Sequence, residues 1–269
     1  MSEELSGSGK RDWFQFHFSS VKVMGEDDVI AAPMGQGVLR KHKSEEWKKL
    51  CDGLPEGTHV NRLHMSGEEL LACTNNGLFR LQDQHWQESE LAIGCYQYKQ
   101  VGRLSLAATQ YGLWSSIGGA WSKTAYAESV VYDFLYLPHF IVLALDKGIA
   151  IYDRFTDSWM DYSFDSAVTS LAVYKGHVLA VTEYGHLLHS NKKGGFESVH
   201  FDNMFLFSIV SKPNGIFLCS NRGLYRLNMM NGSVSLISVK LGCPVTDMDS
   251  DGESFYLATL FEGVQTMGQ

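Results

Sequence analysis

A short phrase recurs seven times along the chain, and its spacing limits the folds that the sequence can adopt. Each copy has a run of small and apolar residues, two or three turn residues, a glycine and a second apolar run. Successive glycines of the phrase are 40, 35, 36, 37, 38 and 40 residues apart. Such a period predicts a repeat architecture built from one supersecondary unit per copy. The copies are AAPMGQGVLR (31–40), ACTNNGLFR (72–80), AATQYGLW (107–114), LALDKGIAIY (143–152), AVTEYGHLL (180–188), LCSNRGLYRL (218–227) and LATLFEGVQTM (257–267).

Each copy reads as four short strands. The first has the form of VNRLHM (60–65) or VTDMDS (245–250), and the second is an apolar run such as FIVLAL (140–145). The glycine turn leads into the third strand, and a bulky residue nine to eleven positions after the glycine marks the fourth. We expect these bulky residues to fill the wide outer gaps between neighbouring sheets. They are Trp47, Trp86, Trp121, Trp159, Phe196 and Val234.

Seven such units predict an all-β fold, a seven-bladed β-propeller of four-stranded antiparallel blades. Residues 11–269 form this single domain, and the Ser/Gly/Glu-rich residues 1–10 are expected to be disordered. The seventh copy stops six residues after its glycine, so no room remains for a fourth strand. Residues 11–18 (RDWFQFHF) alternate aromatic and polar residues. We expect this segment to pair with the last blade as its outer strand and so to close the ring.

The phrase L-A-x-T-x-x-G-L-W/F-R, followed some nine residues later by Trp, resembles the repeats of BNR-like and WD40/YVTN-like bacterial β-propellers. The clearest copy is LSLAATQYGLWSSIGGAW (104–121), and the resemblance covers roughly residues 11–269. It implies the fold and no particular activity. The segments SSIGGAW and RFTDSW lack the full S-x-D-x-G-x-x-W pattern of sialidase boxes, and the Gly-His and Trp-Asp dipeptides of strict WD40 repeats are missing as a set.

Charge and composition exclude several classes of partner. The net charge of −8 argues against a general surface for nucleic acid or an anionic membrane, because both need counter-charge. The local exception, RKHKSEEWKK (40–49), is either a solvated outer edge or a docking patch for an acidic partner. The chain shows neither a signal peptide nor an apolar run near the roughly 18 residues of a membrane span. Five cysteines without a C-x-x-C pair favour a cytoplasmic protein without disulfides.

Aligning the first strands of the copies predicts a polar site along the central channel. The alternative is a water-filled channel whose charges only pair with one another. If the site is real, Asp133 or Asp247 acts as a base while Arg62 or Lys22 holds an anion. The candidate ligand-binding residues are Lys22, Arg62, His64, Tyr98, Asp133, Ser170, Ser208 and Asp247. His64 is also the one histidine that we would test as an acid–base group.

A metal or cofactor is not expected. The stretch DMDSDGE (247–253) fits the first half of a calcium loop, but Ala258 stands at the twelfth position, where the loop needs Glu. The sequence contains no G-x-S-x-G, H-E-x-x-H or P-loop motif. The sequence leaves two functions open, and the lack of a catalytic motif favours the non-catalytic one.

The first function is a non-catalytic module that binds another protein or a small-molecule ligand. The alternative is an enzyme, a lyase, hydrolase or cyclase, that works at the mouth of the channel with Asp133, Asp247 and Arg62 as candidate catalytic residues. The fourth repeat is unusually rich in aromatic residues over 132–164. An aromatic surplus at the rim of that blade would indicate a surface for a partner or an apolar ligand.

Overall fold

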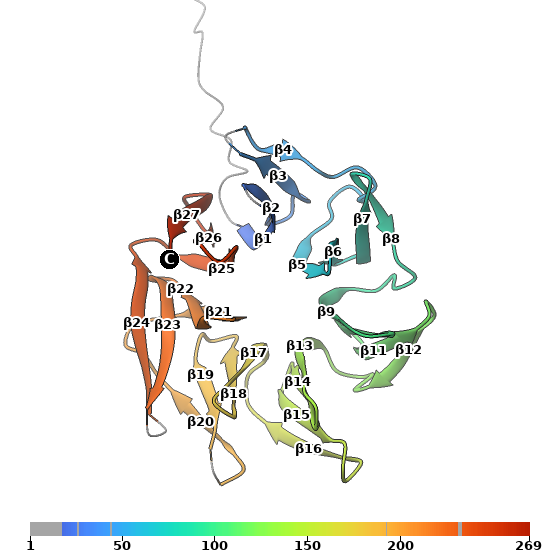
Figure 1. The fold of residues 1–269 in the computed structure, drawn as a ribbon. Helices are drawn as coiled ribbons and strands as arrows, with labels where there is room; N and C mark the ends of the chain where they lie inside the picture. Colours follow the sequence, from blue (N-terminus) through green and yellow to red (C-terminus); the bar gives the residue numbers. More distant parts are fainter. Residues whose placement is uncertain (1–17, 26, 44, 192, 231–232) are drawn as a thin grey trace, which may run out of the picture.

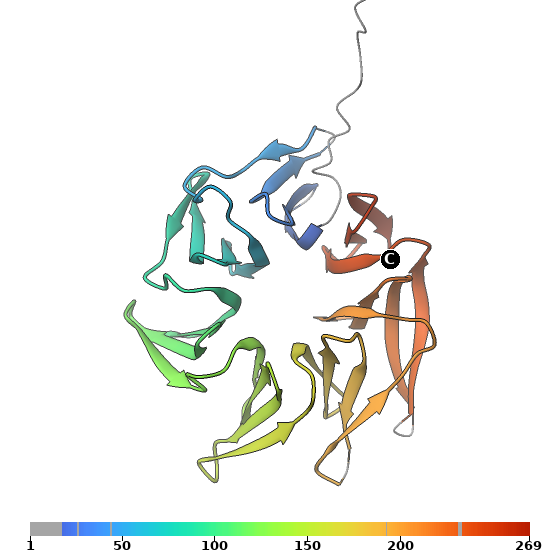
Figure 2. The same cartoon turned by 180° about the vertical axis from the view of Figure 1, so that it is seen from behind.

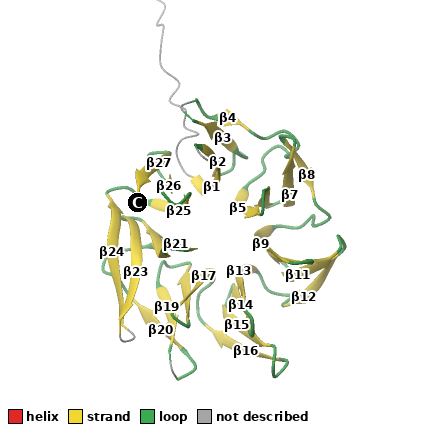
Figure 3. Cartoon of the chain, in the orientation of Figure 1, coloured by secondary structure: helices red, strands yellow, loops and turns green. Residues whose placement is uncertain are grey.

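The computed structural model describes residues 18–25, 27–43, 45–191, 193–230 and 233–269. Seven antiparallel sheets stand around a central axis like the blades of a propeller (Figure 1). The regular elements of the described chain are strands (Figure 3), so none of its elements is an apolar helix long enough to cross a membrane. The prediction of an all-β, seven-bladed propeller is confirmed.

Within each blade the strands follow one another from the axis outward in sequence order. The inner strands are β1 (Phe18–Gly25), β5 (Val60–Ser66), β9 (Cys95–Val101), β13 (Val131–Tyr136), β17 (Val168–Tyr174), β21 (Leu206–Lys212) and β25 (Val245–Ser250). The second strands are β2 (Asp28–Pro33), β6 (Glu69–Thr74), β10 (Leu104–Thr109), β14 (Phe140–Leu145), β18 (His177–Thr182), β22 (Gly215–Ser220) and β26 (Ser254–Thr259). The third strands are β3 (Leu39–His42), β7 (Gly77–Gln82), β11 (Gly112–Ile117), β15 (Gly148–Asp153), β19 (Leu187–Ser190), β23 (Gly223–Met230) and β27 (Val264–Gly268). The outer strands are β4 (Lys48–Lys49), β8 (His85–Glu88), β12 (Trp121–Ala125), β16 (Ser158–Ser163), β20 (Phe196–Val199) and β24 (Ser233–Leu241).

The last blade has three strands in the described part of the chain, β25, β26 and β27. Its predicted outer strand, 11–18, lies outside the described residues except for Phe18. Phe18 begins β1 and stands opposite Pro33 of β2, so this residue belongs to the first blade and not to the last. The described chain closes the ring where β1 lies beside β25 (Figure 2). Val21 and Ala31 of the first blade pack there against Tyr256 and Ala258 of the last.

The ring has two faces, which follow from the up-and-down order of the strands. We call the end at which the inner strands begin the top face, and the end at which they finish the bottom face. The top face carries the turns between second and third strands and the loops that lead to the next blade. The bottom face carries the turns between first and second strands and those between third and outer strands. A residue in a turn can therefore be placed on the top or the bottom face from the two strands that the turn connects.

The second strands are buried because both sides of each blade are covered by neighbouring blades. In β2 and β22 the last five residues are all buried, and these strands read as continuous apolar runs. Cys73 and Cys219, at the same place in their repeats, are fully buried, as expected for small core positions. All five cysteines are free.

The repeat glycine is needed because the third strand starts in close contact with the backbone outside it. A Cβ atom on Gly148 would lie 2.0 Å from the carbonyl oxygen of Tyr162, and one on Gly223 would lie 1.9 Å from that of Lys240. Both glycines also have positive φ values, 138° and 143°, which L side chains rarely adopt. The recurrence of glycine in the sequence phrase thus has a packing cause as well as a turn cause.

The outer-strand aromatic residues do not all fill gaps between blades as expected. Trp86 does, because it is 1% exposed and its indole Nε1 donates to the carbonyl of Leu50 at 2.7 Å. Trp159 is 36% exposed and rests at the surface against the rings of Tyr126 and Tyr152. Trp86 is covered by Leu50, which lies in the loop that arrives from the preceding blade.

This difference predicts unequal costs for the two tryptophans. Trp86→Ala leaves a large cavity and an unpaired carbonyl, so we expect it to lower the free energy of unfolding by about 3–5 kcal/mol. Trp159→Ala, the matched change at an exposed site, is expected to cost less than half as much. Urea unfolding of both variants measures the difference, and equal losses would contradict this account of the outer strands.

Candidate functional site

Every inner strand is irregular at the same place, and this irregularity builds the channel wall. Each of the seven pairs of inner and second strands has a register shift that leaves one inner residue unpaired. These residues are 19, 61, 96, 132, 169, 207 and 246. A bulge of this kind bends the strand and redirects the side chains beside it. The residues that follow the bulges form what we call the polar ring: Ser20, Arg62, Gln97, Asp133, Ser170, Ser208 and Asp247.

Asp133 shows how a member of the polar ring joins neighbouring blades. Its Oδ2 accepts a hydrogen bond of 2.9 Å from the backbone N–H of Leu171 in the fifth blade. Its Oδ1 accepts from Gln97 Nε2 of the third blade at 3.1 Å and from the N–H of Phe134 at 2.8 Å. Both carboxylate oxygens of this buried residue therefore accept hydrogen bonds, and the donors come from three successive blades.

Ser170 and Ser208 continue the same pattern with shorter side chains. Ser170 Oγ accepts from the N–H of Ile209 at 3.2 Å and donates to the carbonyl of the same residue at 3.3 Å. Ser208 Oγ donates to the carbonyl of Thr246 in the last blade at 2.7 Å. Each contact joins an inner strand to the next inner strand around the axis.

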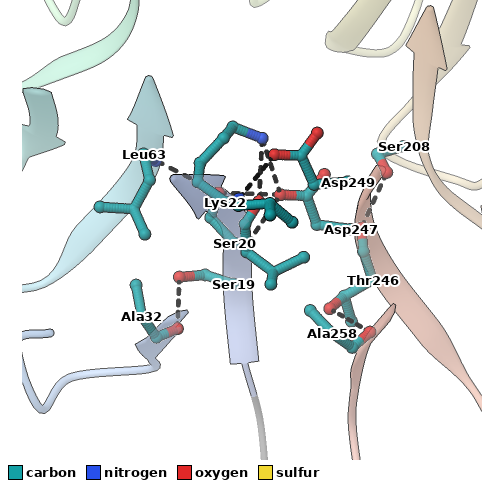
Figure 4. A network of polar contacts seen from close by, with 12 residues as sticks. Ser19, Ser20, Lys22, Ala32, Leu63, Ser208, Thr246, Asp247, Asp249 and Ala258 are labelled. Carbon is teal, nitrogen blue, oxygen red and sulfur yellow. Dashed lines mark hydrogen bonds and ion pairs between the residues drawn. The ribbon is translucent and has the colours of Figure 1, made fainter. Parts of the chain in front are cut away.

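Asp247 closes the ring between the last and the first blade (Figure 4). Its Oδ2 accepts from Ser20 Oγ at 2.8 Å and from the N–H of Val21 at 3.0 Å. Ser20 Oγ in turn accepts from the N–H of Leu63 at 3.2 Å, which connects the first blade to the second. One oxygen of Asp247 thus accepts two hydrogen bonds across the seam between chain segments far apart in sequence.

Two cations face the ring carboxylates. Arg62 Nη1 lies 3.5 Å from Asp133 Oδ1, and Lys22 Nζ lies 3.8 Å from Asp247 Oδ2. Burial alone would lower the pKa of Arg62, but Asp133 and Asp247 hold it above its ordinary value. The guanidinium therefore remains a fixed positive charge inside the channel.

A second layer of side chains lies below the polar ring, toward the bottom face, because residues two apart on a strand share a side. We call it the lower layer; it contains Lys22, His64, Lys99, Leu135, Ala172, Val210 and Asp249. Asp249 is paired with Lys212 and accepts the N–H of Val23 at 2.9 Å. Burial alone would raise the pKa of Asp249, but Lys22 and Lys212 hold it below its ordinary value.

His64 lies among the cations of this layer. Burial, and secondly the charges of Lys22, Arg62 and Lys99, lower its pKa to about 4. Its ring meets the edge of the Tyr98 ring, with centroids 5.7 Å apart. The imidazole is therefore neutral near pH 7, and a general acid of this pKa would hold its proton only in acid solution.

The structure brings most of the predicted site residues together. One cavity of about 280 Å³ along the channel is lined by seven of the eight candidates. The eighth, Ser170, is buried in its contact with the next blade. The seven are Lys22, Arg62, His64, Tyr98, Asp133, Ser208 and Asp247.

Two of the aligned positions differ from the prediction. Ser20 and Gln97 occupy the polar ring where the alignment had placed Lys22 and Tyr98. Lys22 lies one layer lower, and Tyr98 is 3% exposed because its side chain turns between the second and third blades toward Trp121. For Tyr98 the cause is the bulge, which shifts the register by one residue and moves the following side chain to the other side of the strand. The alignment misplaced Lys22 by two residues, so its side chain stays on the channel side.

Sequence reasoning missed five residues of the channel: Ser20, Gln97, Lys99, Lys212 and Asp249. A usable signal was present. In each inner strand an apolar or small residue, such as Val60 or Val245, precedes the ring residue by two positions, and an apolar residue follows it directly. Anchoring the alignment on that apolar pair would have placed Ser20 and Gln97 in the ring.

The three carboxylates of the calcium-like stretch serve different purposes. Asp247 and Asp249 accept backbone N–H groups of β1, whereas Asp251 closes its own turn by accepting from the N–H groups of Glu253 and Ser254. Across the described residues no group of three or more His, Cys, Asp or Glu side chains gathers as a metal site would require.

Comparison with known proteins agrees with the architecture. The extracellular domain of a one-component system from B. thetaiotaomicron superposes with a TM-score of 0.74 at 14% identity; the match covers 93% of this chain but only 38% of that one. The WD40 β-propeller domain of Doa1 gives 0.69 at 15% identity, covering 94% and 93% of the two chains. YCF48 bound to a D1 peptide gives 0.70 at 11% identity, covering 95% and 93%. These likenesses show the fold.

Another neighbour is an enzyme, virginiamycin B lyase from Staphylococcus aureus, with a TM-score of 0.71 at 11% identity and coverage of 95% and 96%. No family model matches the sequence, and no curated protein matches it. WD40 and related seven-bladed propellers, among them a peptide-bound structure and a lyase, thus share this architecture.

The seam contact predicts that Asp247 is structural. Asp247→Ala leaves the N–H of Val21 and the hydroxyl of Ser20 without their acceptor, so we expect a loss of about 2–4 kcal/mol in the free energy of unfolding. Asp247→Asn keeps an acceptor and should lose less, and Asp165→Ala, at an exposed aspartate, should stay within about 0.5 kcal/mol. Urea unfolding orders the three variants; a neutral Asp247→Ala would contradict the assignment.

The lowered pKa of His64 predicts a pH dependence of stability. Its folded pKa of about 4 lies below the ordinary 6.5, so the unfolded chain binds the proton first and stability falls as pH drops from 6.5 toward 4. Between pH 7 and pH 4, His64→Gln should therefore lose less stability than the wild type, by at most about 3 kcal/mol. Urea unfolding at the two pH values measures this, and parallel losses would contradict it.

Proposed function

We propose that the chain is a non-catalytic interaction module that binds an apolar segment of another protein in a groove between the fourth and fifth blades. The groove, which we call the blade 4–5 groove, has a volume of about 420 Å³ and opens toward the bottom face. Its apolar lining consists of Leu137, Pro138, Phe140, Val142, Ile151, Met160, Tyr162, Val173, Val178 and Phe196.

The observation that carries this proposal is the combination of exposed rim and fixed floor. Phe140 is 37% and Met160 41% exposed at the rim, while Val142 is 1% exposed in the floor. Ile151 and Phe196 of the lining pack against the apolar core shared by the two blades. An apolar cleft whose floor is held by the core is pre-formed, and such clefts take the bulky anchor side chains of protein partners.

The chemistry of the groove selects the occupant. Among the residues that the structure describes, its lining contains no carboxylate, lysine or arginine, so a charged segment would lose hydration without gaining a partner from them. Phe155, 76% exposed, stacks on the ring of His139 in the lining and extends the apolar surface beyond the groove. This matches the aromatic surplus noted in the sequence of that repeat. A peptide segment with one or two large apolar side chains fits these conditions.

Two further points support a binding role. The YCF48 structure, which shares the fold, contains a peptide of D1, and Doa1 carries the same kind of propeller. In the channel of this chain both oxygens of Asp133 are occupied by hydrogen bonds between blades. A catalytic base there would have to give up a structural contact, so the groove supports binding better than the channel supports an enzyme.

Selection of a phage-displayed random peptide library on the protein tests the proposal. We expect enriched peptides to carry large apolar residues and to bind Met160→Glu at least about ten-fold more weakly, because the new carboxylate is buried by the peptide. Ile117→Glu introduces the same charge at a residue that is 73% exposed in the third blade, outside the groove, and should bind normally. Failure to enrich any peptide, or equal losses in both variants, would contradict the proposal.

A further inference from the structure

We propose that the lower part of the channel binds a small amphipathic anion. Its charged group would lie beside Lys22, His64 and Lys99, and its short apolar tail would lie against Leu135 and Val210. This site lies on the channel axis, whereas the blade 4–5 groove lies between blades. The two proposals are therefore independent, and each can be tested without the other. The ligand class is an organic sulfonate, carboxylate or phosphate with a compact hydrocarbon part.

The basic side of the site comes from the first three blades. Lys22 Nζ donates to the carbonyl of Val21 at 2.9 Å and lies 3.8 Å from Asp247, so its charge is only partly balanced. Lys99, on the third blade, makes no ion pair with any residue that the structure describes. Arg62 lies in the layer above. The polar ring, the lower layer and the partner of Asp249 together hold four cations and three carboxylates: Lys22, Arg62, Lys99 and Lys212, against Asp133, Asp247 and Asp249.

This excess is local and contrasts with the chain as a whole, which carries a net charge of −8. All three carboxylates are held by backbone N–H groups of the next blade in addition to their cations. The charge that remains for a ligand is therefore positive at the blade 1–3 side of the channel. In a narrow site of low dielectric constant such a charge attracts an anion more strongly than it would in bulk water.

The apolar side comes from the fourth, fifth and sixth blades. At the height of His64 their inner strands present Leu135, Ala172 and Val210, of which Leu135 and Val210 are half-buried and line the cavity. An inorganic anion would leave these side chains against water, whereas a ligand with a hydrocarbon tail would cover them. The division of the channel wall into a basic side and an apolar side is what specifies an amphipathic ligand.

His64 supplies the polar contact that orients the anion. It makes no hydrogen bond to any described residue, and its neutral ring always has one N–H to donate. Burial and the nearby cations keep its pKa near 4, so the ring is uncharged at pH 7 and donates without requiring a counter-ion. An anion bound beside it would stabilise the imidazolium and raise this pKa. His64 is thus both part of the site and a reporter of its occupancy.

Proton NMR of the His64 ring tests the proposal on the full chain. The resonances are identified by their loss in His64→Gln, and the probe is 1-butanesulfonate, which stays ionised across the pH range. We expect a saturable shift at pH 7 and a raised His64 pKa in its presence. Sulfate, which has the charge alone, should bind more weakly, and 1-butanol, which has the tail alone, should give no saturable shift.

Matched lysine variants locate the binding. Lys99→Gln removes an exposed charge beside the site and should weaken butanesulfonate binding about five-fold. Lys123→Gln removes the same charge from the outer strand of the same blade and should leave binding unchanged. No saturable shift with butanesulfonate, or equal weakening in both variants, would overturn the site; sulfate binding as tightly as butanesulfonate would overturn its amphipathic character.

Discussion

The structure depends on hydrogen bonds between side chains of the polar ring and the backbone of neighbouring inner strands, which occur at five of the seven junctions between blades in the described chain. Apolar packing between blades is strong but non-directional, so it does not by itself set how far one blade slides against the next. The ring sets this register, since Asp133 reaches Leu171 and Ser170 reaches Ile209 at a fixed height. The bulge in each inner strand is what turns these side chains toward the next blade.

The seam between the last and first blades shows why the ring matters most there. Ser20 and Asp247 are 227 residues apart, and no short loop connects their two blades. Elsewhere a loop ties one blade to the next, but at the seam only non-covalent contacts hold β1 against β25. The apolar cluster of Val21 and Tyr256 buries apolar surface at the seam, and the hydrogen bond to the Asp247 carboxylate fixes the position of β1 against β25. Closure therefore depends on groups that sequence inspection first suggests as catalytic.

Because these carboxylates hold the blades together, other surfaces are better candidates for binding a partner. A buried carboxylate that accepts backbone N–H groups is fixed in position, and moving its proton during a reaction would weaken the contact. The described lining of the blade 4–5 groove contains no carboxylate, and His64 and Lys99 of the lower layer make no hydrogen bond between described blades. The groove has an apolar lining whose deepest residues pack against the core, and the lower layer has an excess of positive charge beside apolar side chains. Both can bind a partner without disturbing the contacts that hold the propeller together.

The sequence predicted the number of blades and the strand order, and its alignment of the channel residues was wrong at two positions. Glycine spacing marks the start of the third strand because the backbone packs closely there, as at Gly148, so the repeat could be counted. The position of Tyr98 was misjudged by one residue because a bulge breaks the alternation on which strand alignment depends, whereas Lys22 was misjudged by two residues and so stays on the channel side. Hydrogen bonds from Ser20 and Gln97 to other blades were not predictable, since they join residues distant in the chain.

Native-state hydrogen exchange of the amides bonded to the ring tests the central claim most directly. The account predicts that the amides of Val21, Leu63, Leu171 and Ile209 exchange only through global unfolding, with a common free energy equal to that of urea unfolding. Fast exchange at Val21, while the other three stay protected, would show that the seam opens independently and would contradict the claim that the ring closes the propeller.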